Sequence, residues 1–101
     1  MSWKPGDTLP KDPSSKVVYL FDWDDWLTSG AAIATSTYTV DGADAALTTD
    51  NGSIVSGGRQ TQVRVLGGTA GITYTLTNHI VTNTSPTEED DRSVSFTVKN
   101  L

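Results

Sequence analysis

Three aspartates carry the residue types best suited to site chemistry, and they lie together in the segment DWDDW at residues 22–26. Paired carboxylates can hydrolyse glycosides, and the oxygens of Asp22, Asp24 and Asp25 could bind calcium. The spacing matches no calcium-binding loop, however, and no glycine turn lies inside the segment. An aspartate-capped turn with tryptophans packed beneath it is therefore the favoured interpretation. We expect no catalytic residue, no metal site and no cofactor.

The single histidine, His79, is the other candidate for chemistry. An imidazole can act as a base, but catalysis usually also requires a nucleophile and an orienting acid. The chain has no cysteine, and its glycine pairs at residues 57–58 and 67–68 lack the Lys-Ser/Thr ending of a phosphate-binding loop. We therefore predict a non-enzymatic protein in which His79 lies at the surface or at an interface.

Length and charge limit the remaining classes of function. A chain of 101 residues with 36% apolar residues fits one domain. Its net charge is −5, with six aspartates and no lysine or arginine in residues 22–50 and a second acidic run at residues 88–91. An acidic surface repels phosphate backbones, so nucleic-acid binding is disfavoured. No apolar stretch is long enough to span a membrane, and prolines and charges after Met1 argue against a secretory signal.

Residues 1–15 are predicted to be an extended N-terminal arm. Three prolines in this stretch fix the backbone and remove hydrogen-bond donors, so it cannot be an inner strand. Trp3 and Leu9 are apolar residues on a segment with no core of its own. They are candidate interface residues that dock on the body or on a neighbouring chain; the alternative is a mobile terminus.

Residues 16–101 are predicted to form one β-sandwich domain. Apolar and polar residues alternate clearly in residues 59–66, 72–82 and 93–99, as in half-buried strands. Residues 16–22 are apolar on both faces, so we expect this strand to be covered on both sides. Further strands are expected at residues 31–40, 45–49 and 53–56, with turns at residues 41–42 and 50–52. About seven strands at this spacing predict an all-β, immunoglobulin-like antiparallel sandwich.

Several aromatic and aliphatic residues are assigned to the core. Leu76 and Phe96 lie on the apolar faces of their strands. Tyr74 opens a strand after a glycine-containing crossover, and as a tyrosine corner its hydroxyl would bond to the backbone of residues 66–70; a plain core tyrosine is the alternative. We assign Trp26 to the core and Trp23 to an interface, although spacing alone does not separate the two.

Several segments together resemble a known group of proteins. They are KDP at residues 11–13, YLFDW at 19–23, DWL at 25–27, IATSTYTV at 33–40, VLGGTAGITYTLTN at 65–78 and DRSVSFTV at 91–98. This combination is similar to short structural proteins of tailed-bacteriophage and prophage virions, some of which are fibre-to-tail adaptors. The acidic loop at residues 88–91 departs from the group's pattern.

The resemblance implies a role in the virion. It implies a structural protein that is made in the host cytoplasm, occurs in several copies on a symmetric particle and contacts tail tube, adaptor or fibre proteins. A capsid decoration protein and a carbohydrate-binding module on the virion remain alternatives.

Overall fold

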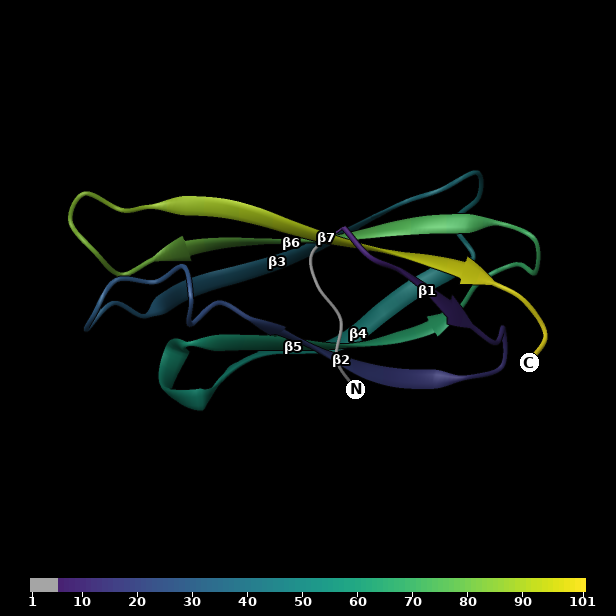
Figure 1. Cartoon of the computed structure of the whole chain (residues 1–101), viewed down its shortest axis with the longest axis horizontal. Coiled ribbons are helices and arrows are strands. Elements are labelled where there is room, and N and C mark those ends of the chain that lie inside the picture. Colours follow the sequence, from purple (N-terminus) through teal and green to yellow (C-terminus); the bar gives the residue numbers. More distant parts are fainter. Residues whose placement is uncertain (1–5) are drawn as a thin grey trace.

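Two β-sheets packed face to face make up the computed structural model, which describes residues 6–101 (Figure 1). The strands are β1 (Thr8–Lys11), β2 (Lys16–Asp22), β3 (Ile33–Asp41), β4 (Leu47–Val55), β5 (Gln60–Gly67), β6 (Thr73–Thr82) and β7 (Glu89–Val98). One sheet has the order β1-β7-β6-β3 and the other β2-β5-β4. The prediction of an all-β sandwich with about seven strands is confirmed. No helix within residues 6–101 has the length and apolarity to cross a membrane.

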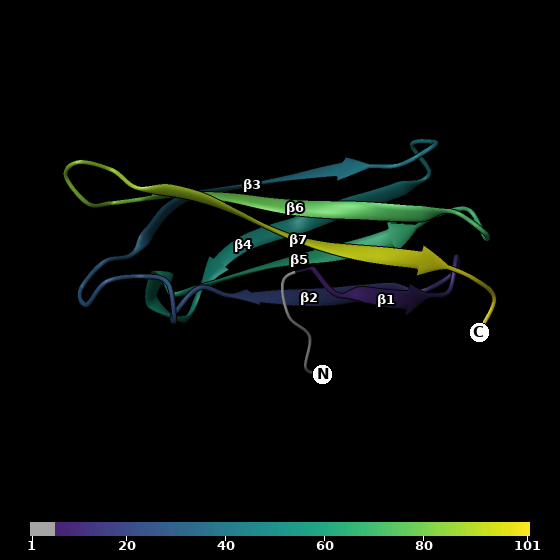
Figure 2. The ribbon, with the colours of Figure 1, turned by 45° about the horizontal axis from the view of Figure 1, so that its top comes forward.

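The core lies between the sheets, which Figure 2 shows as two layers. Period-two alternation directs every second side chain of each strand inward. The rings of Tyr19 from β2 and Phe96 from β7 meet across the core with their centroids 4.8 Å apart. Tyr74, Leu76 and Phe96 are fully buried. Burying a large apolar side chain contributes about 1.5–3 kcal/mol, so these contacts are the main source of stability.

Part of the predicted arm is a strand of the sandwich. Residues 8–11 form β1, which pairs with β7 in parallel, whereas the other strand pairs are antiparallel. The strands of residues 16–101 pair antiparallel as predicted, and the parallel β1–β7 pair is an additional feature that the sequence analysis did not predict. It arises because the chain passes to the other sheet between β1 and β2 and forms no hairpin there. Pro10 has no donor for a ladder, which suits an edge strand. Leu9 is half-buried against the core, and Trp3 lies outside the described residues.

Two boundaries differ from the expected ones. The segments predicted as two short strands around a turn at residues 50–52 form one strand, β4, with an irregular register between Asp50 and Ser53. Asn51 has a positive φ of 52°, so the Asp-Asn-Gly sequence makes an irregularity within the strand instead of a hairpin turn. Similarly, β7 begins at Glu89, inside the acidic loop assigned to residues 88–91, because its first residues pair with the end of β6.

Candidate functional site

The DWDDW segment is a tight turn at the end of β2. The backbone N–H groups of Trp26 and Leu27 both donate to the carbonyl of Trp23 at 3.0 Å. The carboxylate of Asp22 accepts the N–H of Asp24 at 3.0 Å, which closes an aspartate turn. The segment is therefore the aspartate-capped turn that the sequence favoured.

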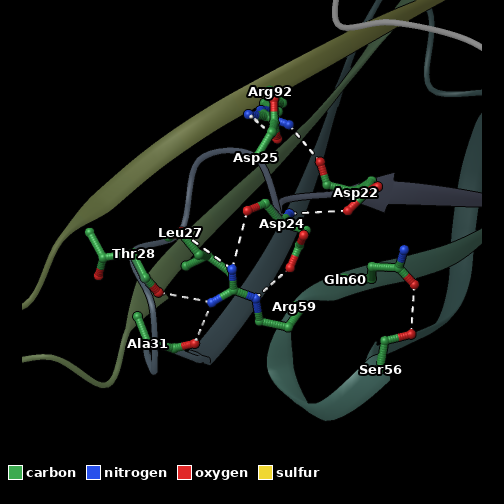
Figure 3. A network of polar contacts seen from close by, with 10 residues as sticks. All are labelled: Asp22, Asp24, Asp25, Leu27, Thr28, Ala31, Ser56, Arg59, Gln60 and Arg92. Carbon is green, nitrogen blue, oxygen red and sulfur yellow. Dashed lines mark hydrogen bonds and ion pairs between the residues drawn. The ribbon is translucent and has the colours of Figure 1, made fainter.

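Arg59, just before β5, holds this turn and the loop that follows it (Figure 3). Its Nε donates to the carboxylate of Asp24 at 2.7 Å. Its Nη1 donates to the carbonyls of Thr28 and Ala31 at 2.9 and 3.0 Å, and its Nη2 to those of Asp24 and Leu27 at 3.2 and 3.3 Å. A guanidinium has five N–H donors, and all five are used here. Arg59 thus fixes the backbone of residues 24–31.

Arg92 of β7 ties the same turn to the opposite sheet (Figure 3). It donates to the carbonyl of Asp22 at 2.6 Å and forms an ion pair with the carboxylate of Asp25 at 3.1 Å. Its guanidinium carbon also lies 4.4 Å from the centroid of the Trp23 ring, a cation–π contact. Asp24 and Asp25 therefore pair with different arginines, and no group of three acidic, histidine or cysteine side chains in residues 6–101 is placed to hold a metal ion.

The two tryptophans differ in burial from the expected order. Trp23, assigned to an interface, is fully buried, whereas Trp26, assigned to the core, is only half-buried and packs edge-on against Trp23 with ring centroids 5.6 Å apart. The reason is the alternation of β2. Tyr19 and Phe21 point inward, and Trp23 continues the same row beyond the end of the strand.

A buried amide, Asn78 on β6, connects the two sheets. Its side-chain oxygen accepts the indole N–H of Trp23 at 3.0 Å and the hydroxyl of Thr61 on β5 at 2.6 Å. Its side-chain nitrogen donates to the hydroxyl of Ser36 and the carbonyl of Thr37 on β3, at 2.8 and 3.0 Å. The hydrogen-bonding capacity of the amide is thus satisfied. The sequence analysis did not single out this residue, although a polar side chain in an apolar row is a signal for such a network.

His79 bridges two acidic residues on the outer face of the β6–β7 pair. Its Nδ1 lies 2.5 Å from a carboxylate oxygen of Asp91, and its Nε2 lies 2.9 Å from one of Glu89. The hydrogen bonds to Asp91 and then to Glu89 raise the pKa of the imidazole. Because both ring nitrogens have partners, neither is free to act as a base or to bind a metal in this conformation. The expectation that His79 contacts a partner protein stays a prediction.

Tyr74 forms the predicted tyrosine corner. Its hydroxyl accepts the backbone N–H of Thr69 at 2.8 Å and donates to the carboxylate of Asp44 at 2.6 Å. The hydrogen bond from Tyr74 is the main reason that the pKa of Asp44 is lowered. Gly42 lies against the same ring, since an added Cβ would come within 2.4 Å of Tyr74 Cδ2.

A buried lysine, Lys11 at the end of β1, was also not foreseen. Its ammonium donates to the carbonyls of Asp12, Ser15 and Gly67 at 2.9, 2.9 and 2.7 Å. Desolvation lowers the pKa of this amine. The adjacent Asp12 accepts the backbone N–H groups of Leu101 and Ser14, and mainly for that reason its pKa falls to about 2. The turn after β1 is therefore fastened to β5 and to the C-terminus.

Comparison with known proteins agrees with the resemblance seen in the sequence. No curated protein matches the chain. A protein-family model described as "Podophage GP4 fiber-tail adaptor protein gp77" matches residues 11–97, which include every strand from β2 to β6 and most of β7. Since this match covers well over half of the chain, the protein belongs to the podophage GP4 fiber-tail adaptor protein gp77 family.

Proposed function

We propose that this chain is a non-enzymatic structural protein of a podophage virion that joins fibres to the tail. The observation that carries the proposal is the family match over residues 11–97. The local chemistry supports it. The carboxylates of Asp24 and Asp25 pair with arginines, and both nitrogens of His79 pair with carboxylates, so these groups stabilise the fold and are not poised to react with a substrate.

An immunoglobulin-like classification is supported by the strand order. In chain order β2, β4 and β5 correspond to strands B, D and E of an immunoglobulin domain, and β3, β6 and β7 to strands C, F and G. The order β2-β5-β4 in one sheet and β7-β6-β3 in the other is the one found in such domains. The tyrosine corner at the start of β6 lies where these domains place it. A sandwich of this type offers several strands and loops for contacts with other proteins.

The burial of Trp23 favours protein contacts over the carbohydrate-binding alternative. Glycan-binding sites generally need exposed aromatic rings beside polar groups, and Trp23 has no exposed surface. Trp26 is half-buried, and its neighbours Asp24 and Asp25 are engaged with arginines. The aromatic turn is therefore better suited to stabilising the fold than to binding a sugar.

We also propose that His79 and Trp3 contact partner proteins in the particle. The side chain of His79 is 41% exposed and lies at one end of a row of cross-strand hydroxyl pairs on a polar sheet face. These pairs are Thr73–Thr97, Thr75–Ser95 and Thr77–Ser93. Replacing either candidate by alanine should leave the isolated protein folded and reduce its incorporation into particles. Normal incorporation of both variants would contradict the assignment.

The adaptor role can be tested in particles that lack the protein. Phages in which the gene is deleted should assemble filled capsids with tails but without fibres, as seen by cryo-electron microscopy. Adding the purified full-length protein together with purified fibres should restore both the fibres and infectivity. Complete fibres on the deletion particles would overturn the proposal. If those particles also have unstable capsids, the decoration role would replace it.

A further inference from the structure

The strand β2 has apolar residues on both faces, but the fold covers only one of them. Tyr19 and Phe21 point into the core and are buried. Val18 and Leu20 point the other way and are 56% and 42% exposed. An exposed apolar strand at the edge of a sheet tends to pair with another chain, so natural proteins usually avoid one. The expectation that both faces are covered is therefore not met by residues 6–101 alone.

The free edge of β2 also differs from the other sheet edges of the described chain. β2 is the end strand of its sheet and runs along the lower border of the molecule in Figure 1. Edge strand β1 is only four residues long and contains Pro10, and β4 is irregular between Asp50 and Ser53. The edge strand β3 presents threonines on its exposed face. Short length, proline, an irregular register or a polar exposed face protect those three edges. By contrast, β2 is seven residues long, pairs in a regular register and exposes Val18 and Leu20 between its two charged ends.

The charges at the ends of β2 are self-complementary. The exposed face of the strand reads Lys16, Val18, Leu20 and Asp22. If a second copy of β2 runs antiparallel about a two-fold axis at Tyr19, Lys16 lies opposite Asp22 of the second copy. In the same register Val18 lies opposite Leu20 of the second copy. Opposite charges and apolar side chains placed directly across two strands stabilise the pair.

Both charged groups, Lys16 and Asp22, are exposed, and neither is held in an ion pair of the described residues, although Lys16 is one cause of the lowered pKa of Asp50. The carboxylate of Asp22 accepts only the backbone N–H of Asp24 among the hydrogen bonds of the described chain. A shift of the register by two residues would put Lys16 opposite Leu20 and lose both charge pairs. The sequence of the strand thus selects one register.

We infer that two copies of this protein associate through β2, in antiparallel register centred on Tyr19, so that their three-stranded sheets become one continuous sheet. Such a contact is isologous: the same patch serves both copies, as in most two-fold dimers. We choose a second copy of the same chain as the partner because the row Lys16, Val18, Leu20, Asp22 matches an antiparallel copy of itself in both charge and apolar character. The inference does not depend on the adaptor role and can fail or succeed separately from it.

Charge reversal tests the pairing in solution. Sedimentation velocity of the purified full-length protein over a range of concentrations should reveal a monomer–dimer equilibrium. Lys16→Asp places like charges opposite each other at both ends and should raise the dissociation constant by roughly tenfold or more. The exchange Lys16→Asp with Asp22→Lys restores opposite charges and should restore the dimer. Ile54→Lys, at an exposed apolar residue of β4, is the matched control and should leave the affinity unchanged.

Cysteine cross-linking tests the register. The chain has no cysteine, so each introduced thiol is unique. A mixture of Val18→Cys and Leu20→Cys proteins should form mixed disulfide dimers in clear excess over either variant alone, since these positions face each other across the two-fold axis. A wild-type protein that is monomeric at all concentrations would overturn the inference. So would a dimer unaffected by Lys16→Asp, or a folded double-exchange variant that stays monomeric.

Discussion

The indole nitrogen of Trp23 donates a hydrogen bond of 3.0 Å to the side-chain oxygen of Asn78, and both residues are fully buried. Trp23 follows β2 in one sheet, and Asn78 belongs to β6 in the other. The bond therefore joins the two layers of the sandwich inside the core. A buried network whose members are all satisfied favours a single relative position of the sheets.

Removing the amide of Asn78 should destabilise the protein. In Asn78→Ala the indole N–H of Trp23 and the hydroxyl of Thr61 lose their acceptor in the core. Leaving such groups unsatisfied costs about 1–3 kcal/mol each in the free energy of unfolding. Urea denaturation should show this loss, while Thr35→Ala on the exposed face of β3 should change the stability by less than about 0.5 kcal/mol. Equal stabilities of the two variants would contradict the role of Asn78.

Trp23→Ala should be far more damaging than Trp26→Ala. Trp23 has no exposed surface, and truncating a buried tryptophan typically costs about 3–5 kcal/mol. Trp26 is half-buried and has less apolar surface to lose. Thermal unfolding of the two variants gives the comparison. A larger loss of thermal stability in Trp26→Ala than in Trp23→Ala would mean that Trp26, and not Trp23, is the core tryptophan.

Arg59 should contribute more than its ionic partner Asp24 to holding the loop at residues 24–31 in place. Four of the five hydrogen bonds of Arg59 go to backbone carbonyls, so Arg59→Met should loosen residues 24–31 and speed their amide hydrogen exchange. Asp24→Asn removes only the ion pair, in which the Asp24 side chain is 66% exposed, and should cost less than about 1 kcal/mol. If Asp24→Asn speeds the amide exchange of residues 24–31 as much as Arg59→Met does, the ion pair, and not the carbonyl contacts, holds the loop.

Chelators should leave the stability unchanged. Asp24 and Asp25 are paired with Arg59 and Arg92, and their carboxylates do not converge on one point (Figure 3). The unfolding midpoint should therefore be the same in calcium and in EDTA. If EDTA lowers the midpoint, and Asp24→Asn removes that sensitivity, the turn is a cation site.

The His79 cluster should stabilise the fold mainly at low pH. Its hydrogen bonds to Asp91 and Glu89 raise the pKa of His79 above the ordinary value of 6.5 in the folded state. A raised pKa adds stability that is fully present below the unfolded-state value and is lost as the pH rises through the folded-state value. Wild type should thus exceed His79→Gln in stability more at about pH 5.5 than at about pH 9. An NMR titration should show a lower His79 pKa in Asp91→Asn than in wild type, and a smaller decrease in Glu89→Gln, because the hydrogen bond to Asp91 is the larger cause.

Much of the sandwich could be predicted because alternation is local. The strands around Tyr74 and Phe96 alternate over many residues, and the tyrosine corner needs only a short crossover, so both could be inferred from the sequence. The parallel pairing of β1 with β7 could not, because it joins the two ends of the chain. The burial of Lys11 depends on the carbonyl of Gly67, which no local pattern reveals.

The acidic turn was predictable in type but not in its partners. The cap by Asp22 is a contact between near neighbours, whereas Arg59 and Arg92 reach the turn from distant positions in the chain. The position of Trp23 could have been inferred by continuing the inward row of β2 past its last residue. The polar Asn78 within the row of Tyr74, Leu76 and Ile80 was a similar signal that polar partners lie opposite.

The parallel pairing of β1 with β7 determines how the domain would respond to mechanical load. A force between the two termini pulls β1 and β7 in opposite directions along their common axis, because the strands run the same way and the pulled ends are opposite. Such a shear loads all of their hydrogen bonds at once, whereas peeling apart a hairpin breaks them one after another. The bonds of Lys11 to Gly67 and of Asp12 to Leu101 lie in the same path and share that tension. A tether fixed at the two ends of this chain would therefore load the β1–β7 pair in shear before it could extend the rest of the sandwich.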